Sequence, residues 1–360
     1  MTNIVSIATA LPKHKYDQQE ILAFMKNAYN LDESEARILS FLYAQSAIQF
    51  RFSVLSDYNN NSSGNFVPLD KNAPYPSLEK RMEIYEAESV KLSIQAIENC
   101  LYEKIGKEKI THLITISCTG MSAPGLDLTL VEQLNLPSTI QRTSINFMGC
   151  YAAIHGLKMA QQIAESSKEE ANILIVATEL CTLHFQKEYT RENAASTMLF
   201  ADGCAAILLN NDNTINQLAQ LQFFFSKVNF SGKKDMAWQL SSSGFLMTLS
   251  GYIPKIIEAD IEQLVQEALQ KYGLQQSEIT HWCIHPGGKK ILDVIQQKLK
   301  LSDKQMQPSR KVLNQFGNMS SPTILFVLKE ILEEIKDNKA IIFGLAFGPG
   351  LTMETFIAIK

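Results

Sequence analysis

Residues 110–118 read Ile-Thr-His-Leu-Ile-Thr-Ile-Ser-Cys, and residues 279–285 read Ile-Thr-His-Trp-Cys-Ile-His. The two stretches begin alike and lie 169 residues apart (279 minus 110). Two more pairs of segments recur in the same order at an offset of 168 residues, Phe147–Cys150 with Gln315–Asn318 and Ile173–Glu179 with Ile341–Phe347. Segments that repeat in one order at a nearly constant offset predict a duplicated half of the βαβ type.

The repeat makes Cys150 and Asn318 equivalent positions of the two halves. Two similar halves that pack together bring their equivalent loops close to one another. We therefore expect Cys150 and Asn318 in one region, with His285 contributed by the second half. A cysteine, a histidine and an asparagine that meet in a cleft are typical of nucleophilic acyl transfer.

The composition indicates a large folded protein and excludes several classes of function. The chain has 360 residues, of which 46% are hydrophobic and 19% charged, enough for two domains with a large core. A net charge of −4 without a Lys/Arg-rich run argues against nucleic-acid binding. No apolar stretch approaches the roughly 20 residues of a membrane-spanning helix, and residues 1–12 lack the basic start of a signal peptide.

The six cysteines are scattered, and none forms a Cys-x-x-Cys pair. This pattern argues against a zinc site and against a disulfide framework. We therefore expect a cytoplasmic protein that holds no metal.

The order of the expected elements is typical of an α/β fold, since strands and helices alternate. Residues 57–76 are rich in Asn, Ser, Gly and Pro and form an expected loop. Expected helices span 17–52, 79–101, 127–134, 254–272, 288–299 and 321–336, and expected strands span 112–118, 140–146, 173–179, 204–209, 281–285, 340–346 and 351–359. The polar stretch 210–217 marks the junction, which divides the chain into halves of 1–213 and 214–360.

Cys150 follows Gly149 and precedes a helical pattern that begins Tyr-Ala-Ala. The unpaired N–H groups and the positive dipole end at a helix N-terminus favour a thiolate. Cys150 is therefore the candidate nucleophile, which His285 would hold as a thiolate–imidazolium pair. The local pattern alone fits a buried packing cysteine equally well.

His285 and Asn318 also have two interpretations each. His285 ends an apolar strand just before Pro-Gly-Gly and could simply cap the next helix. Asn318 lies before an expected helix, where asparagine is a good N-cap. Together, an amide and an imidazole N–H would form a two-donor site for an enolate or oxyanion, and the presence of Cys150 favours that interpretation.

Three further stretches resemble the chalcone synthase family, the type III polyketide synthases of the thiolase superfamily: Trp282–Asp293 (Trp-Cys-Ile-His-Pro-Gly-Gly-Lys-Lys-Ile-Leu-Asp), Phe316–Ser321 (Phe-Gly-Asn-Met-Ser-Ser) and Phe347–Gly350 (Phe-Gly-Pro-Gly). The resemblance covers nearly the whole chain. It implies the thiolase fold, with two duplicated halves in a five-layered αβαβα arrangement, and a homodimer. It also implies iterative condensation of malonyl-CoA with an acyl-CoA starter, then cyclisation to a pyrone, resorcinol or phloroglucinol-type product. These CoA thioesters are substrates, so no cofactor is expected, and an acyl-carrier protein stays open as starter donor.

The family's functional residues can be carried over position by position. Its catalytic Cys, His and Asn match Cys150, His285 and Asn318, and its gating phenylalanine matches Phe200. The second gating aromatic falls at Met247, with Phe245 two residues away. Further residues that the resemblance places at the pocket are Cys118, His184, Ala123, Ser320, Gly348 and Pro349. The basic residues that grip CoA in plant members are mostly missing, and the nearest candidates are Arg37 and Arg51.

Departures from the plant pattern suggest a bacterial-type enzyme with a reshaped pocket. Met247 and Ala123 replace a phenylalanine and a methionine, and Cys118 adds a small wall residue, whereas His184 is bulkier than its counterpart. A thioether wall adapts its shape more readily than an aromatic one. We therefore expect a medium or long fatty acyl-CoA as starter.

Other assignments fit the residues less well. A β-ketoacyl-acyl-carrier-protein synthase III shares the fold and the Cys-His-Asn set, but it usually has His-Gln-Ala-Asn where this chain has His285-Pro-Gly-Gly. A non-catalytic subunit of the same fold would lack the nucleophile, and Cys150 is present. A Cys-His-Asn protease does not suit the chain order or the repeat.

Overall fold

The computed structural model describes residues 1–59, 62, 64–70, 72–212, 214, 216–336 and 339–360. Within these residues, nine strands form one mixed sheet, in the spatial order β11 (His281–Ile284), β12 (Ile341–Gly348), β13 (Thr352–Ile359), β8 (Ala219–Val228), β1 (Thr2–Ala10), β7 (Asp202–Asn210), β6 (Asn172–Leu180), β4 (His112–Ser117) and β5 (Gln141–Asn146). The first four strands belong to the second half of the chain, and the other five to the first half.

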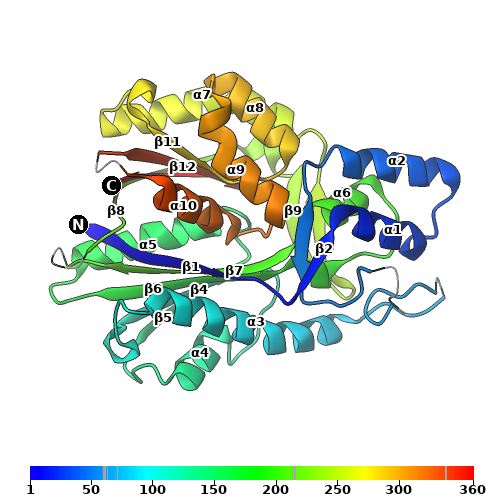
Figure 1. Cartoon of the computed structure of the whole chain (residues 1–360), viewed down its shortest axis with the longest axis horizontal. Helices are drawn as coiled ribbons and strands as arrows, with labels where there is room; N and C mark the ends of the chain where they lie inside the picture. Colours follow the sequence, from blue (N-terminus) through cyan, green and yellow to red (C-terminus); the bar gives the residue numbers. More distant parts are fainter. Residues whose placement is uncertain (60–61, 63, 71, 213, 215, 337–338) are drawn as a thin grey trace.

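The two halves of the sheet join along a narrow seam, where β1 pairs with β8 over Thr2–Ile4 and Ala219–Leu221. Two helices, α5 (Ala152–Ser166) and α10 (Thr323–Glu334), lie between the halves and contact strands of both. Figure 1 shows α3 (Leu78–Leu101) and α4 (Leu126–Leu134) outside one half of the sheet. It shows α7 (Ile253–Tyr272), α8 (Lys289–Leu299) and α9 (Asp303–Phe316) outside the other, which gives the layers αβαβα.

The duplication predicted from the sequence is confirmed by matching hydrogen bonds in the two halves. The Thr111 hydroxyl accepts from the backbone N–H of Asn172 at 2.9 Å and donates to its carbonyl at 3.0 Å. The Thr280 hydroxyl makes the same two bonds to Ile341, again at 2.9 and 3.0 Å. Each hydroxyl therefore joins the residue just before a strand, β4 or β11, to the start of the neighbouring parallel strand, β6 or β12.

The core lies on both faces of the sheet, because helices cover both. All nine residues of β6 are buried, as are all but the first of β12, which matches their continuous apolar sequences. α5 approaches the sheet closely through small residues, since a Cβ at Gly156 would lie 2.7 Å from Ile116. None of the helices in the described residues is long and apolar enough to cross a bilayer.

The expected single helix over 17–52 is wrong. The segment contains α1 (Gln18–Ala28), α2 (Glu33–Ala44) and β3 (Phe50–Ser53), and β3 pairs with β2 (His14–Asp17). Asp17 and Asp32 each form a capping box that starts a new helix. Elements that the sequence analysis did not propose include α9, α6 (Arg191–Leu199) and the hairpin of β9 (Met236–Ser241) and β10 (Gly244–Leu249).

Candidate active site

The loop between β5 and α5 carries Cys150 in a sharply bent backbone. Phe147 and Gly149 both have positive φ angles, 58° and 84°, and such strain in a bulky phenylalanine is typical of functional loops. Glycine is required at position 149 because of its positive φ angle and because a Cβ there would lie 2.3 Å from Cδ of Pro349. Pro349 therefore supports the nucleophile loop from the end of the second half.

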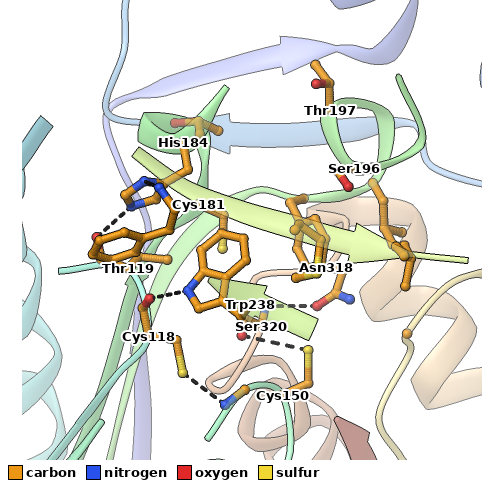
Figure 2. Close-up of a pocket in the computed structure, with 18 of the residues that line it drawn as sticks. Cys118, Thr119, Cys150, Cys181, His184, Ser196, Thr197, Trp238, Asn318 and Ser320 are labelled. Atoms are coloured by element: carbon orange, nitrogen blue, oxygen red, sulfur yellow. Dashed lines mark hydrogen bonds between the residues drawn. The ribbon is translucent and has the colours of Figure 1, made fainter. Parts of the chain in front are cut away.

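The Cys150 thiol is nearly buried and donates a hydrogen bond to the hydroxyl of Ser320, with 3.7 Å between sulfur and oxygen (Figure 2). Burial raises the pKa of this thiol to about 11, and the nearby Glu179 carboxylate also raises it. The hydrogen bonds between the sulfur and the side chains of Ser320 and Asn318 lower this pKa. Burial therefore favours the neutral thiol form of this side chain.

Asn318 is held against the segment that carries Phe200. Its backbone N–H donates to Leu199 at 3.0 Å, and its carbonyl accepts from Ala201 at 2.9 Å. Its side-chain oxygen accepts from the Ser320 backbone N–H at 2.8 Å (Figure 2). These partners assign the amide orientation, and they leave the NH₂ group for the thiol of Cys150.

Asn318 is not the N-cap of the following helix, since α10 begins at Thr323 with Pro322 in the cap position.

His285 follows β11, and its backbone N–H donates to the carbonyl of Leu345 at 2.8 Å. The side chain is 2% exposed, and neither ring nitrogen has a hydrogen-bond partner among the described residues. Burial lowers the pKa of this imidazole to about 3. Buried polar atoms without partners are costly and rare in proteins, so the ring is held ready for a ligand. Burial thus disfavours the charged forms of both groups, and the thiolate–imidazolium pair expected from the sequence stays a prediction.

Cys150, His285 and Asn318 line one cavity. Most of the pocket residues inferred from the sequence line the same cavity, namely Phe200, Met247, Phe245, Cys118, His184, Ser320 and Pro349. Met247 and Phe245 both face it because alternate residues of a strand share a face. Both candidate positions for the second gating aromatic therefore lie at the cavity.

Two of the inferred pocket residues lie elsewhere. Ala123 is exposed in the loop after β4 and does not line the cavity of its own chain. Gly348 lies behind the nucleophile loop, where a Cβ would come within 2.5 Å of the Tyr151 ring and 3.3 Å of the Cys150 nitrogen. Gly348 therefore allows close packing of the loop instead of forming a wall.

The two arginines considered for CoA binding have different surroundings. Arg37 is exposed on α2, and its guanidinium lies 3.4 Å from the Glu33 carboxylate. Arg51 is 4% exposed and lines the cavity, but it donates to the carbonyl of Phe200 at 2.6 Å, to that of Thr197, and to the Gln18 side chain at 2.9 Å. These inward contacts do not support the assignment of Arg51 to CoA, because its donors hold the Phe200 segment.

Sequence reasoning missed the contribution of the hairpin to the cavity. Trp238 pairs with Met247 and Met236 pairs with Leu249 across the two strands, and all four residues line the cavity. Apolar residues at every second position, 245, 247 and 249, were a signal for a strand, although Leu246 interrupts the strict alternation. The run of three serines before Gly244 marked the turn.

Glu179 is a second missed residue. Its fully buried carboxylate accepts hydrogen bonds from the Cys118 backbone N–H at 2.9 Å, the Thr119 hydroxyl at 2.8 Å and the Ser321 hydroxyl at 2.6 Å. Burial raises the pKa of this carboxyl group. Glu179 thus connects the end of β4 with the loop that carries Asn318.

A cysteine thiol, an amide donor and an imidazole without a ring-nitrogen partner among the described residues line one cavity of a duplicated α/β scaffold, a set that is typical of acyl transfer. The N-terminal domain of the chalcone and stilbene synthases matches residues 1–213, and the C-terminal domain of the same family matches residues 220–359. The chain therefore belongs to the chalcone and stilbene synthase family, the type III polyketide synthases.

Individual relatives agree with this assignment. The chain is 28% identical to type III polyketide synthase C of Arabidopsis thaliana, over 98% of this chain and 94% of that protein. The crystal structure of PKS-I from the brown alga Ectocarpus siliculosus covers 100% of this chain and 98% of its own, with 26% identity and a TM-score of 0.89. The C-terminal type III polyketide synthase domain of Steely1 from Dictyostelium covers 100% and 99%, with 27% identity and a TM-score of 0.90.

These similarities establish the thiolase fold for the whole described chain. They do not favour a β-ketoacyl-acyl-carrier-protein synthase III, since both halves match the chalcone and stilbene synthase family.

Proposed function

We propose that the protein extends an acyl group on Cys150 by repeated decarboxylative condensation with malonyl-CoA and then releases a cyclised pyrone, resorcinol or phloroglucinol-type product. The observation that carries the proposal is that Cys150, His285 and Asn318 line one cavity, in which both ring nitrogens of His285 are free of partners among the described residues. In this reaction class the protein is an acyltransferase that releases CoA at each transfer.

The first step is transfer of the starter from CoA to Cys150. The neutral imidazole of His285 accepts the thiol proton while the sulfur attacks the thioester carbonyl. The C–S bond to CoA then breaks, and the CoA thiolate takes that proton from the imidazolium. The low pKa of His285 supports this role, since only a neutral ring can accept a proton.

The second step is decarboxylation of malonyl-CoA. The bond to the malonyl carboxylate breaks, CO₂ leaves, and the electron pair forms an enolate on the thioester. The Asn318 NH₂ group and a His285 N–H donate hydrogen bonds to the enolate oxygen. The enolate carbon then attacks the acyl carbonyl on Cys150, whose sulfur leaves, so that the product is a β-ketoacyl-CoA ready for another cycle.

The test is mass spectrometry of the products that form from malonyl-CoA and a panel of acyl-CoA starters. The modified peptide of starter-loaded enzyme should contain Cys150, and Cys150→Ala should abolish loading. Acylation of another cysteine, or undiminished loading of Cys150→Ala, would contradict the assignment of the nucleophile.

We also propose that the protein acts as a cytoplasmic homodimer in which the loop Met121–Gly125 lies near the partner's cavity. Met121 is 46% exposed, and Ala123 is exposed beside it. All six cysteines are free and buried, which suits a reducing compartment. Sedimentation that shows an active monomer would contradict the dimer.

The starter donor is tested by comparing the loading of Cys150 from an acyl-CoA with its loading from the same acyl group on a carrier protein.

A further inference from the structure

Two residues that line the active-site cavity carry a buried polar side-chain atom without a hydrogen-bond partner among the described residues. One is His285, whose two ring nitrogens have a role in the proposed chemistry. The other is Ser196, whose hydroxyl oxygen is buried. A buried hydroxyl without a partner costs free energy and is rare in proteins. Ser196 is therefore a further polar group held in the cavity, and no contact of the fold accounts for it.

The other described serine and threonine hydroxyls at the cavity are all engaged within the protein. Their partners and distances between the heavy atoms are Glu179 at 2.8 Å for Thr119, Asp202 at 2.6 Å for Thr182, Tyr29 at 3.1 Å for Thr197 and the Cys150 sulfur at 3.7 Å for Ser320. These bonds hold the walls together. The hydroxyl of Ser196 takes no part in them, so it remains available to a molecule inside the cavity.

Ser196 lies in α6, one turn before the helix ends at Leu199. A serine inside a helix commonly donates its hydroxyl to the carbonyl four residues earlier, as Ser40 of α2 does to Ala36 at 2.6 Å. The hydroxyl of Ser196 makes no such bond within the described part of the chain. Figure 2 shows it pointing from α6 towards the enclosed space of the pocket.

The end of α6 is joined to the segment that carries Asn318. The carbonyl of Leu199 accepts from the Asn318 backbone N–H at 3.0 Å, and the Asn318 carbonyl accepts from the Ala201 N–H at 2.9 Å. The Phe200 N–H donates to the carbonyl of Ser196 at 3.0 Å, so Ser196 is one helical turn from this junction. The cavity wall therefore presents the Ser196 hydroxyl as a fixed donor beyond the amide of Asn318.

We infer that Ser196 is a specificity-determining residue whose hydroxyl donates a hydrogen bond to the keto oxygen of a β-ketoacyl chain held on Cys150. This inference rests on the proposed function. A chain that has undergone one condensation carries a carbonyl at its third carbon, in addition to the thioester carbonyl beside the sulfur. A keto oxygen that leaves water for an enclosed cavity needs a donor there. A plain acyl starter has no such oxygen, so Ser196 favours the second and later condensations over the first.

The experiment extends octanoyl-CoA and 3-oxooctanoyl-CoA with malonyl-CoA, or the matched pair of the chain length that wild type extends fastest. The measured quantity is the ratio of kcat/KM for the oxo starter to kcat/KM for the plain one. Ser196→Ala should lower this ratio by a factor of about 2 to 10, the usual effect of one neutral hydrogen bond. Ser196→Cys keeps nearly the size of serine with a weak donor and should lower it as well. The matched control Ser89→Ala removes a buried hydroxyl of α3 that is likewise unpartnered among the described residues but lies outside the cavity, and it should leave the ratio unchanged.

Starter loading on Cys150 and CO₂ release from malonyl-CoA are measured in the same samples. Wild type that neither loads nor releases CO₂ would contradict the proposed function. Wild type that extends both starters, with the same ratio in Ser196→Ala, would overturn the role of Ser196 alone. A ratio that falls in Ser196→Ala but not in Ser196→Cys would also overturn it, because size and not hydrogen bonding would then be responsible. If thermal unfolding shows that Ser196→Ala does not fold, Ser196→Cys decides by the same ratio.

Discussion

The sulfur of Cys118 accepts a hydrogen bond from the backbone N–H of Gly149, with 3.0 Å between the two atoms. Gly149 immediately precedes Cys150, so the residue that follows β4 holds the loop of the candidate nucleophile through a side-chain contact. The backbone carbonyl of Cys118 binds the Trp238 indole. Cys118, which was expected only to line the pocket, therefore also joins the loop of Cys150 to the hairpin of β9 and β10.

Replacement of Cys118 by alanine should leave the Gly149 N–H buried without an acceptor. We expect the free energy of unfolding to fall by about 1–3 kcal/mol, with a lower kcat because the nucleophile loop loses a support. Cys118→Ser supplies an oxygen acceptor and should recover part of both losses. Chemical denaturation and steady-state kinetics measure the effects, and equal behaviour of the alanine and serine variants would show that the hydrogen bond has no such role.

The pH dependence of Cys150 alkylation tests the resting protonation state. Burial raises the thiol pKa to about 11, so the thiolate fraction increases with pH throughout the neutral and mildly alkaline range. The rate of iodoacetamide modification should rise about tenfold per pH unit between pH 7 and pH 9.5, since the thiolate is the nucleophile. The modified peptide is quantified by mass spectrometry. A rate that is already constant from pH 6 upwards would instead indicate a thiolate–imidazolium pair with His285.

Asn318→Ala should separate the two chemical steps. Loss of one oxyanion-type donor typically lowers a rate by roughly 10²–10³, so CO₂ release from malonyl-CoA should fall by that factor, whereas starter loading on Cys150 should largely survive. Thr323→Val is the matched control, because it keeps the Asn318 amide and removes the weak 3.5 Å contact to its oxygen together with the 2.9 Å hydrogen bond from the Met319 backbone N–H. Poor loading with normal CO₂ release in Asn318→Ala would place this residue in the loading step.

Arg51→Met should behave as a structural variant. One buried and two partly buried acceptors lose their donor, so we expect the free energy of unfolding to fall by about 1–3 kcal/mol, together with a lower kcat from the loosened Phe200 segment. Arg37→Met changes an exposed side chain and should stay within about 0.5 kcal/mol of wild type. Urea denaturation and the KM for malonyl-CoA are compared in both. Unchanged stability with a raised KM in Arg51→Met would restore the CoA assignment.

The sequence allowed two of the candidate catalytic residues to be placed at one site because the duplication relates them. Cys150 and Asn318 are equivalent in the repeat, and the fold places equivalent loops at one cavity. The short apolar strands were also predictable, since β6 and β12 are buried along nearly their whole length. Their burial follows from helices on both faces, which the alternation of elements indicated.

Other features depend on contacts between residues far apart in the chain. The cluster of Trp238, His184 and Phe245 forms because the hairpin packs against the end of β6. No local pattern in either segment predicts that the two segments contact each other. Arg51 was considered for CoA because of its charge, yet its partners at Thr197 and Phe200 are more than 140 residues away. A single sequence does not reveal which charged side chains turn inward.

The matched hydrogen bonds of Thr111 and Thr280 have a consequence for how this catalyst can evolve. The two halves keep the same arrangement of strands and helices, whereas their equivalent loops carry a cysteine in the first half and an asparagine in the second. Because the scaffold is present twice, one half can retain a reactive residue while the other half acquires a residue that supports it. A new reaction can then arise as the loops of the two halves diverge, without any change in the fold that joins the halves.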